Sequence, residues 1–78
     1  MDKKALSNEF GAALRRIRND KGMTQDALAE KLEINSPYIS RLESGQKHPS
    51  LEMIWKLAKA MGIKASDIIK AVEDRERT

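Results

Sequence analysis

The side chains that could take part in chemistry are few, and their types exclude several kinds of site. The chain contains no cysteine, and its only histidine is His48. Disulfides, thiolate metal sites, cysteine nucleophiles and histidine metal clusters are therefore excluded. No nucleophile stands at a useful spacing from a base, and no carboxylate pair suggests acid–base catalysis. We accordingly expect no enzymatic activity, no metal and no cofactor.

Another group of polar side chains lies between Gln25 and His48. Two short helices are expected there, separated by a turn over residues 33–35. Ile39 and Leu42 face inward at helical spacing, which leaves the opposite face of the second helix polar. That outward face carries Ser36, Pro37, Ser40 and Arg41. This pattern predicts a helix-turn-helix over about residues 25–44, whose second helix would fit the major groove of DNA.

Charge supports a polyanionic partner only mildly. The 78 residues carry a net charge of +3, with a pI near 9.4. Residues 1–24 are net +3, residues 25–50 are net −1 and residues 51–78 are net +1. The predicted reading segment is thus almost neutral, so flanking segments would have to help hold phosphates. With no signal-like or membrane-length apolar run, we expect a soluble, cytoplasmic protein without membrane contacts.

The elements that must position these side chains form one domain over residues 1–78. Periodicity predicts an all-α, five-helix orthogonal bundle, with helices near 7–21, 25–32, 37–44, 51–61 and 65–75. The expected N-caps are Ser7, Thr24, Ser36 and Ser50. Leu6 and Leu51 are expected on inner faces. The polar residues after Val72 would either extend the last helix or fray.

Three stretches together carry a family resemblance. Thr24-Gln25-Asp26-Ala27-Leu28-Ala29, Tyr38-Ile39-Ser40-Arg41-Leu42-Glu43-Ser44-Gly45 and Pro49-Ser50-Leu51 resemble the lambda-repressor-like, or XRE-type, helix-turn-helix. Small phage repressors and restriction–modification controller proteins belong to this family, and the resemblance covers about residues 8–72. One position departs from it. Glu33 stands where glycine is frequent, which implies a strained or altered turn.

The resemblance implies roles for individual residues. The positions matching base-reading residues are Asn35, Ser36, Pro37 and Arg41. The positions matching phosphate contacts are Gln25, Arg18, Tyr38, Ser44, Lys47 and His48. Arg18 and Glu43 also match an internal ion pair between the first and third helices. Arg41 can donate two hydrogen bonds to guanine, whereas the other reading positions offer little direct discrimination. Affinity would then depend on dimerisation, phosphate contacts and DNA shape as well as on base contacts.

Several of these residues also have an ordinary structural interpretation. Arg41 and Lys47 would suit any solvated surface, Tyr38 could simply pack on the bundle, and His48 could be a plain loop residue. Trp55 either closes the core or lies at a subunit interface. Adjacent residues on a helix diverge by about 100°, so Ile68 and Ile69 cannot both face one core. The family often dimerises through its last helix, which places Trp55, Ile68, Ile69 and Val72 at the expected dimer interface.

The function that follows is a sequence-specific transcriptional regulator of double-stranded DNA. It would act as a homodimer on a palindromic or pseudo-palindromic operator, as a restriction–modification controller or a phage-type repressor, and without a small-molecule ligand. The alternative is a helix-turn-helix that mainly binds protein, as an antitoxin-like or coactivator-like module. The nearly neutral reading segment keeps that alternative open.

Overall fold

The computed structural model describes residues 1–76, and all of its regular structure there is helical. In chain order the helices are α1 (Lys3–Asp20), α2 (Gln25–Leu32), α3 (Ser36–Ser44), α4 (Leu51–Met61) and α5 (Ala65–Glu76). No strand occurs in the described part of the chain. The prediction of an all-α protein with five helices is therefore confirmed.

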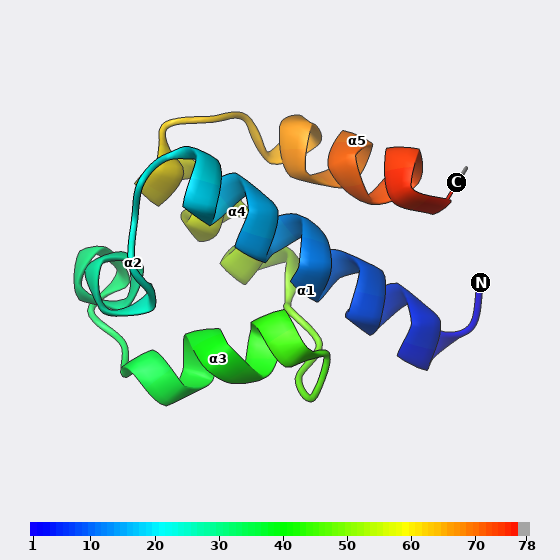
Figure 1. The fold of residues 1–78 in the computed structure, drawn as a ribbon, viewed down its shortest axis with the longest axis horizontal. Helices are drawn as coiled ribbons and strands as arrows, with labels where there is room; N and C mark the ends of the chain where they lie inside the picture. The colour runs from blue at the N-terminus through cyan, green and yellow to red at the C-terminus, as the bar shows by residue number, and fades with distance from the viewer. Residues whose placement is uncertain (77–78) are drawn as a thin grey trace.

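The long first helix is the centre of the arrangement. In Figure 1, α1 crosses the molecule with α5 on one side and α3 on the other, and it packs against both. α2 is seen almost end-on and lies against α3 and α4, so it crosses these two helices steeply. Both ends of the described chain lie at the same end of the molecule. The steep crossings fit the predicted orthogonal bundle.

All five helices contribute to one apolar core, which is aliphatic apart from Phe10. Its buried members are Phe10, Ala13, Leu14, Leu28, Ala29, Ile39, Leu42, Leu57, Ala58, Met61, Ile68 and Val72. Ile39 and Leu42 anchor α3 from beneath, as their spacing predicted. Burial of an aliphatic side chain stabilises the fold by about 1.5–3 kcal/mol, so this core fixes the orientation of α3.

Close contact between α1 and the end of α3 depends on the absence of a side chain. A Cβ on Gly11 would collide with the backbone carbonyls of Leu42 and Glu43. Glycine at this position lets the two helix backbones approach until they nearly touch. The C-terminal half of α3 is therefore seated directly on the middle of α1.

Two predicted N-caps were wrong. α1 begins four residues earlier than expected, because the Asp2 side chain accepts a hydrogen bond from the backbone N of Ala5, 2.7 Å away. Ser7 lies within the helix, is buried, and contacts the imidazole of His48 through its hydroxyl. At α3 the cap is Asn35 rather than Ser36. The caps Thr24 and Ser50 are confirmed.

Two leucines expected on inner faces lie outside. Leu6 is 51% exposed, and Leu51 is 78% exposed at the start of α4. The earlier start of α1 places Leu6 in its first turn, where no neighbouring helix covers it completely. Ile68 and Val72 show the opposite behaviour and are buried in the core. The residues after Val72 continue α5 to Glu76, and the last two residues of the predicted tail lie outside the described part.

Candidate nucleic-acid interface

The turn between α2 and α3 adopts a glycine-like conformation without a glycine. Glu33 has φ 57° and ψ 41°, the left-handed region, and is the C-cap of α2. The backbone N of Ile34 then donates to the carbonyl of Ala29 at 3.0 Å, which closes the end of α2. The turn expected from the family resemblance is therefore retained. Its cost is the strain of a glutamate in a conformation that usually needs glycine.

The outward face of α3 is open to solvent. Pro37, Ser40 and Arg41 are exposed there, above the buried Ile39 and Leu42. Gly45 ends the helix with φ 82°, and the backbone N of Gln46 donates to the carbonyl of Arg41 at 2.9 Å. The Arg41 guanidinium is consequently carried on a well-terminated helix and projects from a rigid support.

The remaining two positions expected to read bases are partly occupied within the chain. Asn35 accepts a hydrogen bond from the backbone N of Tyr38 at 3.0 Å through its side-chain oxygen. The Ser36 hydroxyl donates to the carboxylate of Asp26 on α2. The Asn35 amide nitrogen is the group left to donate outward. Ser36 retains acceptor capacity on its oxygen, so each of the two has fewer groups left for a base edge than an arginine guanidinium has.

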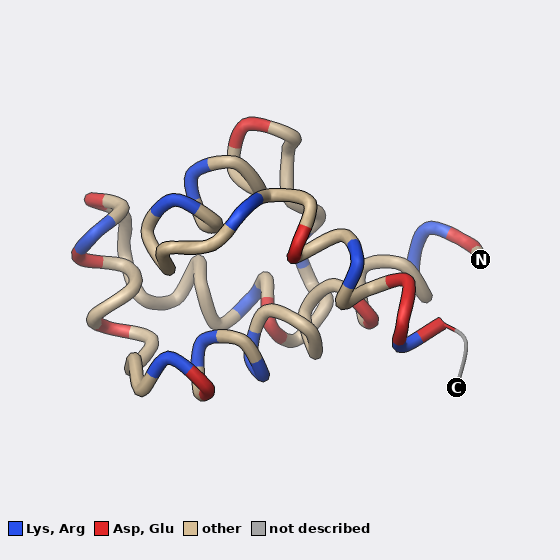
Figure 2. The backbone as a smooth tube through the Cα atoms, turned by 90° about the horizontal axis from the view of Figure 1, so that it is seen from above, with Lys and Arg blue, Asp and Glu red and all other residues tan. Residues whose placement is uncertain are grey.

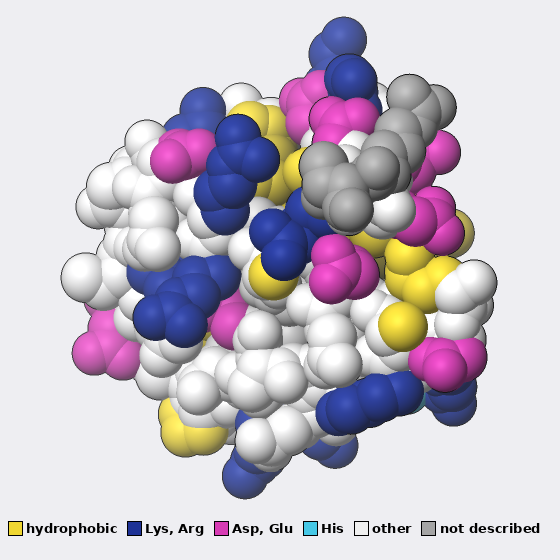
Figure 3. Space-filling model, turned by 45° about the vertical axis from the view of Figure 1, so that its right-hand side comes forward, with side chains coloured by type: hydrophobic (Ala, Val, Ile, Leu, Met, Phe, Trp, Pro, Cys, Tyr) yellow, Lys and Arg dark blue, Asp and Glu magenta, His cyan; other side chains and the backbone are white. Residues whose placement is uncertain are grey.

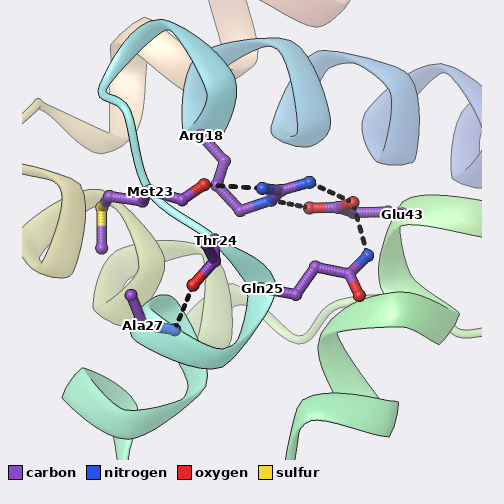
Figure 4. A network of polar contacts seen from close by, with 6 residues as sticks. All are labelled: Arg18, Met23, Thr24, Gln25, Ala27 and Glu43. Carbon is purple, nitrogen blue, oxygen red and sulfur yellow. Dashed lines mark hydrogen bonds and ion pairs between the residues drawn. The ribbon is translucent and has the colours of Figure 1, made fainter.

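A nearly dry ion pair holds the motif to α1. The Arg18 Nε lies 2.6 Å from Glu43 Oε2, and its Nη2 lies 3.1 Å from Glu43 Oε1. The two side chains are only 9% and 4% exposed. Arg18 Nη1 also donates to the backbone carbonyl of Met23 at 2.6 Å. Figure 4 shows the guanidinium lying between that carbonyl and the Glu43 carboxylate. The expected Arg18–Glu43 pair is thus present.

The same network changes the roles expected of Arg18 and Gln25. Each Arg18 guanidinium nitrogen donates to a partner in the chain, and the residue is 7% exposed. A phosphate contact by Arg18 would therefore have to compete with these partners inside the chain. Gln25 Nε2 donates to Glu43 Oε1 at 3.0 Å, so its amide nitrogen is also engaged. What Gln25 still offers a phosphate is the second N–H of that amide and the backbone at the N-terminus of α2.

The other positions expected to contact phosphate lie around the end of α3. Ser44 is exposed, and its hydroxyl donates to the carbonyl of Arg41 at 3.2 Å. Lys47 and His48 are exposed in the connection to α4. Tyr38 is half-buried and packs against the core, which agrees with its structural interpretation. Lys47 is the strongest candidate for a phosphate contact among these residues.

Two cationic groups near this surface were not singled out from the sequence. Lys4 Nζ donates to the carbonyl of Gly45, 3.3 Å away, at the end of α3. Arg15 lines a shallow hollow that also includes Asn19 and Glu43. Their position beside α3 follows from how α1 crosses that helix, which spacing along the sequence does not encode. Figure 2 shows both signs of charge interspersed along the chain, without one continuous basic stripe.

The residues expected at a dimer interface divide into two pairs. Trp55 is 66% exposed on α4, and Ile69 is 45% exposed on α5. Ile68 and Val72 belong to the chain's own core, so they can only support an interface from beneath. Within residues 1–76 no helix is long and apolar enough to cross a bilayer. The same residues hold no cluster of three or more potential metal ligands.

Comparison with known proteins places the chain in a family. The model of a helix-turn-helix family matches residues 14–68, most of the chain. The chain belongs to this helix-turn-helix family.

Individual relatives are similar in sequence and in structure. The HTH-type transcriptional regulator DdrOP3 of Deinococcus deserti is 38% identical over 60 residues, which cover 77% of this chain and 46% of that protein. The control protein C.BamHI of Bacillus amyloliquefaciens is 38% identical over 61 residues, covering 77% of this chain and 75% of its own length. The crystal structure of the clp gene regulator ClgR from C. glutamicum superposes with a TM-score of 0.86 at 36% identity, over 90% of this chain and 91% of that one. The chain thus spans less than half the length of the first of these relatives.

Proposed function

We propose that this protein is a transcriptional regulator that binds double-stranded DNA in a sequence-specific manner. The observation that carries the proposal is the exposed face of α3, where Arg41 projects from a helix anchored by two fully buried residues and by the Arg18–Glu43 pair. In this arrangement α3 enters the major groove, and Arg41 donates two hydrogen bonds to a guanine. Asn35, Ser36 and Pro37 lie at the leading end of the helix and contact neighbouring base edges.

Phosphate contacts flank that helix on both sides. The N-terminus of α2 at Gln25 meets one strand, with Tyr38 beside it. Ser44, Lys47 and His48 meet the other strand at the far end of α3. These contacts set the register of α3 on the duplex but carry no sequence information directly. Because the motif itself is nearly neutral, cations on α1, such as Arg15, add to the attraction.

The proposed DNA-binding unit is a homodimer. One Arg41 supplies too little discrimination to select an operator, and two copies related by a two-fold axis double the contacts. Trp55 and Ile69 provide exposed apolar surface for that dimer. Of the similar proteins, one is named as a transcriptional regulator, one as a clp gene regulator and one as a control protein. We propose that the protein acts as a controller of restriction–modification genes or as a phage-type repressor.

Selection from a pool of random duplexes tests this function. The expected product is an inverted repeat, with half-sites about one helical turn apart. Binding should weaken steeply as salt is raised, with a slope of roughly −0.9 per phosphate contacted. If no sequence were enriched and salt had no effect, the regulator proposal would fail. The second candidate function would then apply, in which the helix-turn-helix binds protein. The near-neutral charge of the motif is the observation that favours it.

A further inference from the structure

One face of α1 supports the connection between α3 and α4. Its residues are spaced three or four apart, which places them on one side of the helix. They are Lys4, Ser7, Asn8 and Gly11. Lys4 Nζ donates to the carbonyl of Gly45 at 3.3 Å, and a Cβ on Gly45 would collide with the side chain of Asn8. The start of the connection is therefore held against α1 before the chain reaches Lys47 and His48.

Ser7 is a buried polar residue on this face, and its hydroxyl contacts Nδ1 of the His48 imidazole. Ser7 is 2% exposed, whereas His48 is exposed. A buried hydroxyl needs an acceptor for its proton, because leaving that proton unpaired is costly. Among the described residues the hydroxyl has no partner except the imidazole. Ser7 therefore donates to Nδ1, which must be the acceptor nitrogen of the ring.

The state of the second ring nitrogen follows from this contact. A neutral imidazole carries one proton, so an acceptor at Nδ1 leaves an N–H at Nε2. Nε2 lies on the far side of the ring from Ser7, and no other group in residues 1–76 bonds to it. Lys3, Glu73 and Glu76 border the same hollow as His48, but none of them bonds to the imidazole. The ring thus presents a hydrogen-bond donor to solvent.

We propose that Ser7 is a positioning residue, which holds His48 in the form whose Nε2–H donates to a phosphate of the DNA backbone. This inference rests on the proposed function and specifies one of its phosphate contacts. Phosphate oxygens accept hydrogen bonds, so the other neutral form, with a lone pair on Nε2, could not make the contact. Figure 3 shows several Lys and Arg side chains along the lower edge of the molecule, where Figure 1 places α3 and the connection after it. The imidazole donor therefore adds to an edge that attracts phosphate.

Nitrogen NMR of the imidazole tests the state of the ring. His48 is the only histidine, so a long-range proton–nitrogen correlation spectrum of the labelled chain contains one imidazole. At about pH 8.5, where imidazoles are neutral, we expect the Nε2–H form alone. Ser7→Ala should give a mixture of the two neutral forms. Ser66→Ala, which changes an exposed serine on α5, is the matched control and should leave the spectrum unchanged.

Fluorescence anisotropy with a selected operator tests the phosphate contact. His48→Ala should weaken binding about 10-fold, as expected for the loss of one hydrogen bond to a charged group. Ser7→Ala should weaken it by a smaller factor, because part of the population keeps the Nε2–H form. Adding Ser7→Ala to His48→Ala should cause no further loss, since the two residues act through one contact. Circular dichroism of each variant checks that its helices are intact.

The outcomes separate this inference from the function on which it rests. An Nδ1–H form in the unaltered chain, or equal populations in Ser7→Ala, would overturn the role of Ser7. So would losses of affinity that add in the double variant, and in each case the regulator proposal would stand. A chain that binds no duplex would overturn the proposed function and the phosphate contact together, while the NMR populations would still report whether Ser7 selects the Nε2–H form.

Discussion

At the scale of single residues, Arg18 and Glu43 form an ion pair whose side chains are almost fully buried. Two opposite charges lie 2.6 Å apart where water is nearly excluded, and both are further satisfied, by Met23 and by Gln25. Such a pair adds little net stability compared with apolar residues of similar shape, but either charge alone is costly to leave buried. Its effect is to fix α3 against α1 and against the start of α2.

Removing one charge of this pair should destabilise the fold more than removing both charges. Arg18→Met leaves the Glu43 carboxylate buried without its main partner, and we expect a loss of about 3–5 kcal/mol in the free energy of unfolding. The double change Arg18→Met with Glu43→Leu should recover most of that loss. Urea denaturation of four proteins, the unaltered chain, Arg18→Met, Glu43→Leu and the double variant, measures the difference. Additive effects of the two changes would show that the two charges are not coupled.

The left-handed backbone conformation of Glu33 leads to a second prediction. Its left-handed backbone costs roughly 1–2 kcal/mol for a residue with a side chain, whereas glycine adopts it freely but is more disordered when unfolded. Glu33→Gly should therefore stabilise the fold by about 0.5–1 kcal/mol. Glu30→Gly, inside α2, should instead destabilise it by about 1 kcal/mol. The prediction fails if thermal or urea unfolding shows Glu33→Gly to be the less stable of the two.

At the scale of the elements, the position of α3 depends on its contact with α1. Glycine normally weakens a helix interior, and replacing it with alanine raises the free energy of unfolding by about 1 kcal/mol. At Gly11 the sign should reverse, because a methyl group would meet the backbone of Leu42 and Glu43. We expect Gly11→Ala to cost about 1–3 kcal/mol. Asn19→Ala, exposed on the same helix, is the control and should be neutral or slightly stabilising in urea denaturation.

The sequence was most informative about elements and least informative about how they meet. Thr24 and Ser50 are local signals, and each helix start that they predicted is present. Ser7 and Ser36 were misread because a better cap, Asp2 or Asn35, lies nearby, and the choice depends on packing.

The candidate site, too, could be predicted from the sequence only in part. The exposure of Arg41 follows from helical spacing, which the sequence displays. The engagement of Arg18, Gln25 and Ser36 within the chain depends on the approach of three helices. Spacing along one helix cannot show which of its polar groups are consumed by another.

At the scale of the whole molecule, the proposed regulator binds DNA as two copies that act together. If each copy reads one half-site, joining the half-sites makes the second contact intramolecular and raises affinity by about 100-fold or more. Fluorescence anisotropy with a selected operator and with an isolated half-site measures this gain. Equal affinity for the two duplexes would mean that one copy suffices and that the exposed apolar surface serves another purpose.

The central claim is that the outward face of α3 reads bases while the connection after it holds phosphates. The direct measurement is parallel selection from random duplexes with the unaltered chain, Arg41→Ala and Lys47→Ala. We predict that Arg41→Ala loses preference at one or two base pairs in each half-site and keeps the rest. Lys47→Ala should enrich the same operator with lower affinity and a salt slope smaller by about one. Enrichment left unchanged by Arg41→Ala, or specificity lost equally in both variants, would contradict the account.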